Sequence, residues 1–362
     1  MSEDTVRRGT RTAMLILLVT LLSLLAVGCR AVDVGGGRDV PPPSTAPPTA
    51  EDTRPSGRRP GVVNIETRQS LNGTRAAGTG IVLDPSGLVL TNNHVIRGAT
   101  EIKGTDTDNR RTYSARVVGY DRAGDIAVIR LTGAIRLQAA EFASASDVTV
   151  GDTVTAVGNA GGKGGTPTVV TGRVTALEQS VTARDDTHGT SERLAGLIET
   201  SAPIRPGDSG GPLLNTAGRV IGVNTAASAG FAMNGATPKQ DHRGYAIPSD
   251  DALAVARQIQ RGESSPTVHI GPTAMLGVKV RSTGGVRGAV VAEVVPGAPA
   301  EAAGVPVGAA IVGLGGRVVD SPTTLTALVL AHRPGDIVRV EWTTPQGARV
   351  TAMIRLVEGP PQ

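Results

Sequence analysis

The chain has 362 residues, 39% of them hydrophobic, and a formal net charge of +4 at pH 7. This length suits about two folded domains, and 48 glycines with only 2% aromatic residues favour a turn-rich β protein over a helical bundle. No basic run is interleaved with aromatic residues, one cysteine excludes an internal disulfide framework, and five dispersed histidines lack ligand spacing; we therefore expect no nucleic acid, metal or other cofactor.

Residues 1–29 predict an export signal, because arginines precede an apolar run at residues 13–27 that is short for a membrane span. The run ends in Ala-Val-Gly-Cys, which resembles the lipobox of bacterial lipoproteins except that Ala stands where Leu is usual. Three interpretations stay open: a lipid anchor on Cys29, an uncleaved N-terminal helix in the membrane, or free secretion. Each of them exports the rest of the chain.

A linker is predicted between this signal and the first folded domain. Residues 30–60 are rich in Gly, Pro, Ser and Thr and hold few large apolar side chains, so we expect them to be disordered. The linker is either a spacer or an inert tail.

A β-rich domain is predicted over residues 61–262. Residues 80–83 and 87–90 form an expected hairpin, because Asp84, Pro85 and Gly87 suit a type I turn. Further short strands, spaced as in a barrel or sandwich, are expected at residues 115–120, 125–131, 153–157, 168–177, 197–200, 219–224 and 244–247.

One helix is predicted after the last of these strands. Ser249 is expected to cap its first turn, and Leu253, Ala256 and Ile259 form an apolar stripe at helical spacing. Gly262 is expected to end the helix.

The strongest chemical signal is Gly-Asp-Ser-Gly-Gly-Pro at residues 207–212. A nucleophilic serine, here Ser209, needs a tight turn, and the surrounding glycines let the N–H groups of Gly207 and Ser209 face a developing oxyanion. His94, in Thr-Asn-Asn-His-Val, is the expected general base, and Asp125 is expected to orient its imidazole. The sequence therefore predicts nucleophilic catalysis by a Ser-His-Asp triad.

These motifs, together with Gly-Tyr-Ala-Ile-Pro at residues 244–248, resemble those of the HtrA (Deg) family of serine proteases. The resemblance covers residues 61–358 and implies a mainly β fold, a chymotrypsin-like double β-barrel followed by a C-terminal PDZ domain. It places His94 and Asp125 on the first barrel and Ser209 on the second, with the site in the cleft between them.

The resemblance also bears on surface loops and assembly. Residues 158–167 and 182–193 correspond to loops that order on activation in this family, and four glycines within residues 161–165 make ordering costly. Family trimers rely partly on aromatic residues near the start of the protease domain, but residues 57–75 contain none. A homotrimer therefore stays an open expectation.

The residue before the nucleophile departs from the family pattern, since Asp208 stands where Asn is more common. In trypsin-like zymogens an Asp at this place pairs with a freed N-terminus, which the long tether makes inaccessible in this chain. Arg205 is either the partner of Asp208 or an exposed arginine.

The resemblance to trypsin-like folds also implies a specificity pocket. Its base is Pro203 with Ile204 beside it, and one wall is the strand end at Asn224, Thr225 and Ala226. None of these residues carries a carboxylate that could pair with Arg or Lys, so the pocket is expected to take Val, Ala, Ile or Leu.

Residues 270–358 carry a second pattern, which resembles a PDZ domain. Main-chain N–H groups of the segment Met275, Leu276, Gly277 and Val278 would bind the terminal carboxylate of a C-terminal peptide, which would add a strand beside the one that follows. Ala309 replaces an Asp that is common in this segment.

The helix expected at residues 323–332 carries Leu325 and the apolar residues 328–330, which either flank the peptide groove or belong only to the core. Peptide binding either activates the protease or only captures substrate.

The leading functional prediction is a serine endopeptidase of the cell envelope, anchored at the outer face of the cytoplasmic membrane, that cleaves unfolded or damaged exported proteins. A dedicated signalling protease with one native substrate has the same sequence features. The alternative from a different functional class is a non-catalytic, tethered peptide-binding or chaperone protein.

Overall fold

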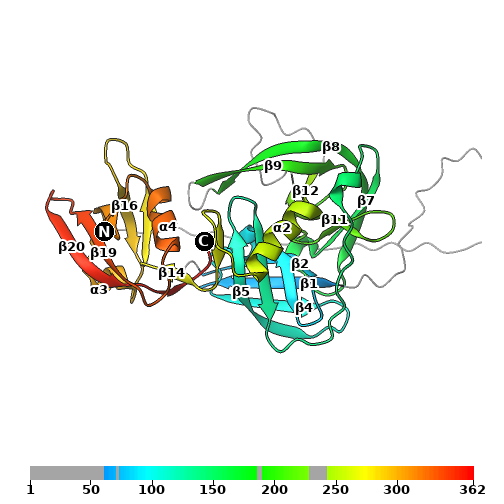
Figure 1. Cartoon of the computed structure of the whole chain (residues 1–362), viewed down its shortest axis with the longest axis horizontal. Coiled ribbons are helices and arrows are strands. Elements are labelled where there is room, and N and C mark those ends of the chain that lie inside the picture. Colours follow the sequence, from blue (N-terminus) through cyan, green and yellow to red (C-terminus); the bar gives the residue numbers. More distant parts are fainter. Residues whose placement is uncertain (1–60, 71–72, 186–189, 228–242) are drawn as a thin grey trace, which may run out of the picture. The chain divides into compact units, whose positions relative to one another are not determined.

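The computed structural model describes residues 61–70, 73–185, 190–227 and 243–362 (Figure 1). The predicted export signal, Cys29 and the linker lie outside the described residues. Within these ranges, no helix combines the length and the apolar character needed to cross a membrane.

The first barrel is a closed antiparallel sheet in the order β5-β4-β1-β2-β3-β6, with β6 pairing back to β5 and β13 added beside β5. Its strands are β1 (Val62–Gln69), β2 (Thr74–Val82), β3 (Leu88–Thr91), β4 (Glu101–Asp106), β5 (Thr112–Asp121), β6 (Ile126–Leu131) and β13 (Val268–Ile270).

The predicted hairpin between β2 and β3 is confirmed. Ile81 pairs with Leu90, and the N–H of Gly87 donates to the carbonyl of Asp84 at 3.2 Å. The Asp84 carboxylate also accepts the N–H of Ser86 at 2.8 Å, which is how an aspartate at the first position stabilises such a turn.

The second barrel closes in the order β10-β11-β12-β9-β8-β7, with β7 pairing back to β10. Its strands are β7 (Thr153–Gly158), β8 (Thr168–Asp185), β9 (Thr190–Thr200), β10 (Pro212–Leu214), β11 (Val220–Ala227) and β12 (Gly244–Pro248). The mainly β, two-barrel prediction is therefore confirmed.

The expectation that residues 182–193 form a surface loop is wrong for most of that segment. β8 continues to Asp185 and β9 begins at Thr190, and the pairing runs without interruption from Thr182 opposite Arg193 to Asp185 opposite Thr190. The pairing of β8 with β9 thus extends into a segment that the family resemblance assigned to a loop.

Three short helical turns connect the barrel strands. They are α1 (Asn93–Ile96), the 3-10 turn η1 (Ala145–Asp147) and the 3-10 turn η2 (Ala160–Gly162). α1 directly follows β3, and η2 follows β7.

Helix α2 (Ser249–Gln260) confirms the predicted helix but corrects its cap and its apolar stripe. Pro248 is the N-cap residue, and the Ser249 hydroxyl instead donates to the Ala143 carbonyl at 2.7 Å. Ala252, Ala256 and Ile259 are the buried apolar residues, whereas Leu253 is half-buried, because the helix packs on the side that Ala252 faces.

The end of α2 follows the prediction. The N–H of Gly262 donates to the carbonyl of Ile259 at 3.0 Å, and Gly262 has φ of 72°, the left-handed conformation that commonly ends a helix.

The C-terminal part contains a five-strand path, β15-β16-β17-β19-β20, with β18 paired to β17, and a separate β14–β21 pair. Its elements are β14 (Thr273–Met275), β15 (Val278–Arg281), β16 (Ala289–Val294), α3 (Pro299–Ala302), β17 (Ala310–Leu314), β18 (Arg317–Val318), α4 (Pro322–Leu330), β19 (Ile337–Thr343), β20 (Arg349–Arg355) and β21 (Val357–Gly359).

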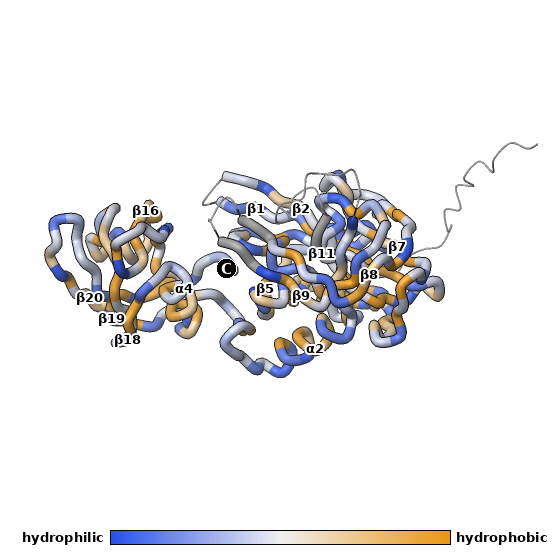
Figure 2. The backbone as a smooth tube through the Cα atoms, turned by 90° about the horizontal axis from the view of Figure 1, so that it is seen from above, coloured by the Kyte–Doolittle hydropathy of each residue, from blue (hydrophilic) through white to orange (hydrophobic). Residues whose placement is uncertain are grey.

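The cores of all these sheets are built mainly from aliphatic side chains, as the composition predicts. Apolar positions recur along the strands (Figure 2). Ile65, Ile81 and Leu90 in the first barrel, Leu213 in the second and Ile311 in the C-terminal part are completely buried.

Candidate active site

His94 and Asp125 lie together because of strand pairing in the first barrel. β3 and β6 are antiparallel neighbours with Thr91 opposite Ala127, so the turn after β3 meets the residue before β6. His94 Nδ1 lies 2.8 Å from Asp125 Oδ2 and 3.0 Å from Oδ1. A carboxylate only accepts hydrogen bonds, so the neutral imidazole carries its proton on Nδ1, leaving Nε2 as the basic nitrogen.

Asp125 is held in an unusual backbone conformation. Its φ of 52° lies in the left-handed region, which non-glycine residues adopt at a cost and Asp tolerates better than most. The main-chain N–H of His94 donates to Asp125 Oδ1 at 3.0 Å, and the side chain of Asn92 donates to the Asp125 carbonyl at 2.9 Å. These bonds fix the carboxylate under the imidazole.

The carboxyl of Asp125 is buried and ionised. Burial by itself raises its pKa, but the attraction to His94 when the imidazole is protonated and hydrogen bonds from His94 and Thr225 hold the pKa below its usual range. A buried anion in this position stabilises a positive charge that forms on the imidazole during catalysis.

Thr225, which the sequence assigned only to a pocket wall, joins the two barrels at this site. Its hydroxyl donates to Asp125 Oδ2 at 2.6 Å, while its carbonyl accepts the Ser209 hydroxyl at 3.1 Å. Thr225 lies on β11 of the second barrel and is 1% exposed. One residue thus contacts both the carboxylate and the predicted nucleophile.

The loop before Ser209 has the geometry of an oxyanion hole. Gly207 has φ of 100°, and a side chain there would collide with the carbonyl of Asn159, so only glycine fits. The N–H of Gly161 donates to the Pro206 carbonyl at 2.8 Å. Since the two ends of a trans peptide point in opposite directions, this bond turns the Gly207 N–H away from Gly161. Within the described residues, neither the Gly207 nor the Ser209 N–H has an acceptor.

Thr79 is a second contributing residue, and no sequence motif singles it out. It lies on β2 and is completely buried, and its hydroxyl donates to the Gly207 carbonyl at 2.7 Å and accepts the Asn159 N–H at 2.9 Å. The Thr79 N–H also donates to the Ser209 carbonyl at 2.8 Å. The first barrel therefore fixes the main chain on both sides of Asp208.

The glycine-rich loop at residues 161–165 is held by several hydrogen bonds. Besides the Gly161 bond to Pro206, the N–H of Gly164 donates to Asn159 Oδ1 at 2.8 Å, and the side chain of Asn64 donates to the Gly165 carbonyl at 2.8 Å. These bonds offset the conformational entropy that four glycines lose on ordering.

Asp208 is 2% exposed and is held by main-chain and hydroxyl groups. Its carboxylate accepts the main-chain N–H of Arg205 at 2.9 Å and the hydroxyl of Thr168 at 3.2 Å. Burial raises the pKa of Asp208, although these bonds and the charge of Arg205 work in the opposite direction. The hydrogen bond with Arg205 thus comes from its backbone rather than from its guanidinium group.

The predicted specificity-pocket residues differ in what they can offer a substrate. Ile204 is 6% exposed and packs in the barrel core, and the Asn224 side chain donates to the carbonyls of Val157 and Pro212. Pro203 is half-buried. Because the side chain of Asn224 is engaged in these bonds, only its main-chain atoms could contact a substrate in the pocket. The side chain of Ala226 lies outside the described residues.

Main-chain hydrogen bonds fix the turn in the segment from Met275 to Val278. The Leu276 carbonyl accepts the Ala300 N–H at 2.9 Å and the Gly277 carbonyl accepts the Val295 N–H at 2.9 Å, which fixes the turn. Gly277 has φ of 85°. β15 follows at the edge of its sheet, so one side of this strand has no partner among the described strands.

Helix α4 begins and ends close to the predicted helix, and its leucines contribute to the core. Leu325 and Leu328 are 3% and 6% exposed and belong to the apolar core of the C-terminal part. Val329 and Leu330 are half-buried. Within the described residues, no group of three or more His, Cys, Asp or Glu side chains could hold a metal ion.

Comparison with known proteins shows the family. A trypsin-like peptidase domain matches residues 78–223 and a PDZ domain matches residues 274–350. The serine protease PepD of Mycobacterium tuberculosis is 35% identical over 325 residues, which cover 87% of this chain and 68% of PepD. The chain belongs to the HtrA family of serine proteases and is a serine-type endopeptidase.

Other similar proteins are also serine proteases by name. The serine protease Do-like HtrA of Bacillus subtilis is 30% identical over 77% of this chain and 63% of that protein. The periplasmic serine endoprotease DegP of Escherichia coli is 34% identical over 70% of this chain and 51% of DegP, so the match spans about half of that relative. A solved HtrA-type protease, AlgW with a tripeptide, is 28% identical over 84% of this chain and 95% of that chain, with a TM-score of 0.46.

Proposed function

We propose that Ser209, His94 and Asp125 carry out the peptide-bond hydrolysis of this endopeptidase. The observation that carries the proposal is the pairing of His94 Nδ1 with the buried Asp125 carboxylate, while Thr225 contacts both that carboxylate and the Ser209 hydroxyl. Ser209 Oγ attacks the carbonyl carbon and its proton passes to His94 Nε2, while Asp125 stabilises the imidazolium.

The oxyanion of the tetrahedral intermediate accepts hydrogen bonds from the N–H groups of Gly207 and Ser209. When the intermediate collapses, the C–N bond breaks, the leaving amine takes the proton from His94 and an acyl-enzyme remains. Water then attacks this ester with His94 again as base, which releases the acid and restores Ser209. The left-handed turn at Gly207 supports this role, because it leaves both N–H groups without an internal acceptor among the described residues.

Cleavage follows small aliphatic residues in this proposal. The pocket beside Pro203 and the strand end at residues 224–226 contain no carboxylate in the sequence, and an unpaired cation buried there would be costly. The chain therefore favours Val, Ala, Ile or Leu before the cut.

The C-terminal part binds the C-terminal ends of peptides, in the groove between β15 and α4. Support comes from the exposed edge of β15 and from the turn at Leu276 and Gly277, whose N–H groups suit a terminal carboxylate. We assign residues 61–262 to the protease domain and residues 270–358 to the PDZ domain. The PDZ domain either captures substrate or activates the protease, and a homotrimer stays part of the hypothesis.

The substrates we propose are unfolded or damaged exported proteins, cleaved in the cell envelope by a protease anchored through its N-terminus. The predicted export signal at residues 1–29 supports this location. A relative, DegP, is described as periplasmic. Cys29 provides the anchor if it is acylated, and an uncleaved helix provides it otherwise.

Digestion of an unfolded substrate and of a stable folded one tests the substrate class. Wild-type protein should cleave casein and spare a folded domain of similar size until that domain is destabilised, and Ser209→Ala should cleave neither. Equal cleavage of folded and unfolded substrates would contradict a quality-control role, and casein cleavage by Ser209→Ala would contradict the catalytic assignment.

Cell fractionation tests the anchor. Under the lipid hypothesis, Cys29→Ser abolishes lipid labelling and alters processing at that site. Unchanged mobility and an unchanged membrane fraction in this variant would favour the uncleaved helix.

A further inference from the structure

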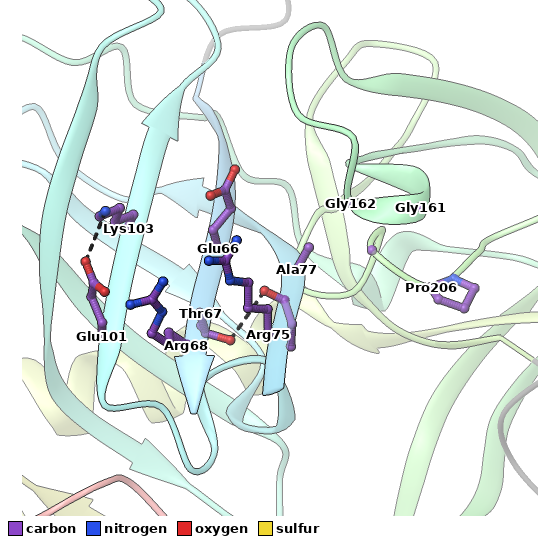
Figure 3. A pocket seen from close by; sticks show the side chains of 12 residues that line it. Glu66, Thr67, Arg68, Arg75, Ala77, Glu101, Lys103, Gly161, Gly162 and Pro206 are labelled. Atoms are coloured by element: carbon purple, nitrogen blue, oxygen red, sulfur yellow. Dashed lines mark hydrogen bonds and ion pairs between the residues drawn. The ribbon is translucent and has the colours of Figure 1, made fainter. Parts of the chain in front are cut away.

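A polar pocket of about 630 Å³ lies beside the oxyanion-hole glycine (Figure 3). One side is formed by Gly207 with the neighbouring Pro206, Gly161 and Gly162, and the other side by residues of β1, β2 and β4. The two barrels touch here, since a side chain at Gly162 would meet Ala77 at 2.7 Å. The pocket therefore adjoins the turn that carries the proposed oxyanion hole.

The expected specificity pocket puts this pocket on the leaving-group side of the site. It shares no residue with the expected specificity pocket at Pro203 and residues 224–226. With the carbonyl oxygen at Gly207 and the preceding side chain in that specificity pocket, the chain after the cut must continue in the other direction. In that direction, the substrate chain meets the surface of β1, β2 and β4.

Strand register places two arginines opposite each other on this surface. Arg68 on β1 pairs with Arg75 on β2, and both side chains are exposed. Like charges directly opposite each other in a sheet are destabilising, so the folded barrel holds this pair at a cost. An anion bound between the two guanidinium groups would remove that cost.

The carboxylates on the same surface only partly neutralise its cations. Glu101 forms an ion pair with Lys103 at 3.0 Å and lies opposite Arg68 in the pairing of β1 with β4, where Glu66 lies opposite Lys103. The hydrogen bond from Lys103, its charge and the charges of Arg68 and Arg75 together lower the pKa of Glu101. The pocket lining holds three cations, Arg68, Arg75 and Lys103, and two carboxylates, Glu66 and Glu101, so the surface has a cationic excess of one charge.

We propose that this leaving-side pocket, the surface of Arg68, Arg75, Glu66 and Lys103 beside Gly207, binds an acidic side chain of the substrate after the cleaved bond. Guanidinium groups bind carboxylates in a bidentate manner. Arg75 is two residues from Ala77 along β2, about 7 Å at the rise of an extended chain. The acidic residue therefore falls at about the second to fourth position after the bond. This inference rests on the proposed role of Ser209.

Matched peptides test the charge preference. Three fluorogenic peptides share Val before the cut and differ only at the third position after it, which is Glu, Gln or Lys. Wild-type kcat/KM should be about three- to tenfold higher for the Glu peptide than for the Gln peptide, which lies within the range for two solvent-exposed ion pairs, and lowest for Lys. The preference should fall as salt is raised from about 0.05 to about 0.5 M. Scanning the Glu through positions two to four locates the contact.

Variants on the pocket surface provide the second arm of the test. Arg75→Gln together with Arg68→Gln should bring the Glu/Gln ratio to within about twofold, and Glu66→Gln should raise it. The matched control is Arg116→Gln, because Arg116 is exposed and pairs with Arg130 on β5 and β6 in the same like-charge arrangement, away from Gly207. Its ratio should equal that of wild-type protein.

A Glu/Gln ratio near one at all three positions in wild-type protein would overturn this inference, and so would a ratio that survives loss of both arginines. Labelling of Ser209 by a fluorophosphonate distinguishes the two failures. A protein that is labelled and cleaves peptides without charge preference refutes only the leaving-side pocket, whereas a protein that is not labelled refutes the proposed site itself.

Discussion

Removing the hydroxyl of Thr79 tests whether the first barrel holds the proposed oxyanion hole, which lies on the second barrel, in position. Thr79→Val keeps the shape of the side chain and the main-chain bond to Ser209, but the Gly207 carbonyl and the Asn159 N–H lose their hydroxyl partner. Only the longer Asn159 N–H to Gly207 carbonyl bond, at 3.3 Å, then remains. The peptide that follows Gly207 can rotate, and with it the direction of the neighbouring N–H groups.

The expected loss of stability and of reaction rate follows from the hydrogen bonds that Thr79→Val removes. An unsatisfied buried polar group costs about 1–3 kcal/mol of unfolding free energy. Complete loss of one oxyanion donor costs about 10²- to 10³-fold in kcat, so a misaligned donor should cost about 10- to 100-fold. We therefore expect Thr79→Val to fold, to be destabilised by about 1–3 kcal/mol, and to react about 10- to 100-fold more slowly with a fluorophosphonate.

Thr200→Val is the matched control. Thr200 is also completely buried, and its hydroxyl donates to the Arg173 carbonyl at 3.0 Å and accepts the Ala202 N–H at 3.1 Å. Thr200→Val therefore loses one donated and one accepted hydrogen bond, as Thr79→Val does, but Thr200 does not contact Gly207. Denaturant titration should give similar destabilisation for both variants, while the labelling rate of Thr200→Val stays within about threefold of wild type. Equal labelling rates for both variants would refute a specific role for Thr79.

Three further predictions concern the triad, the buried acid and the specificity pocket. Asp125→Asn should lower kcat about 10⁴-fold in peptide hydrolysis, because the imidazole loses the acceptor that holds its tautomer. Asp208→Asn should be more stable than wild type at neutral pH in denaturant titrations. Burial raises the folded-state pKa of Asp208, so the ionised acid destabilises the fold above that pKa. The difference should shrink as pH falls through the raised pKa towards 3.8, and a difference that stays constant with pH would contradict burial of the ionised acid as its cause. Sequencing of cleavage products should find Val, Ala, Ile or Leu before the cut, and a majority of Arg or Lys would refute the proposed pocket.

Local sequence patterns predicted the parts of this protein that depend on neighbouring residues. The turn at Asp84–Gly87, the end of α2 at Gly262 and the tight turn around Ser209 each follow from residue types within a few positions. The two-barrel fold followed from the resemblance that such motifs carry together.

Long-range contacts set the remainder of the site, and no local pattern encodes them. Thr79 reaches Gly207 across 128 positions and Thr225 reaches Asp125 across 100, and both look like ordinary strand residues. Ser249 matched a cap pattern, but a tertiary hydrogen bond to Ala143 takes its hydroxyl. The facing arginines at positions 68 and 75 appear only once the strand register is known.

Mapping the fluorophosphonate adduct on the full-length folded protein by mass spectrometry tests the proposed triad most directly. We predict one adduct, on Ser209, whose formation slows in acid as the imidazole of His94 becomes protonated and is lost in Ser209→Ala and His94→Ala. An adduct on another residue, or no adduct on folded protein that still cleaves casein, would contradict the assignment of Ser209 and His94.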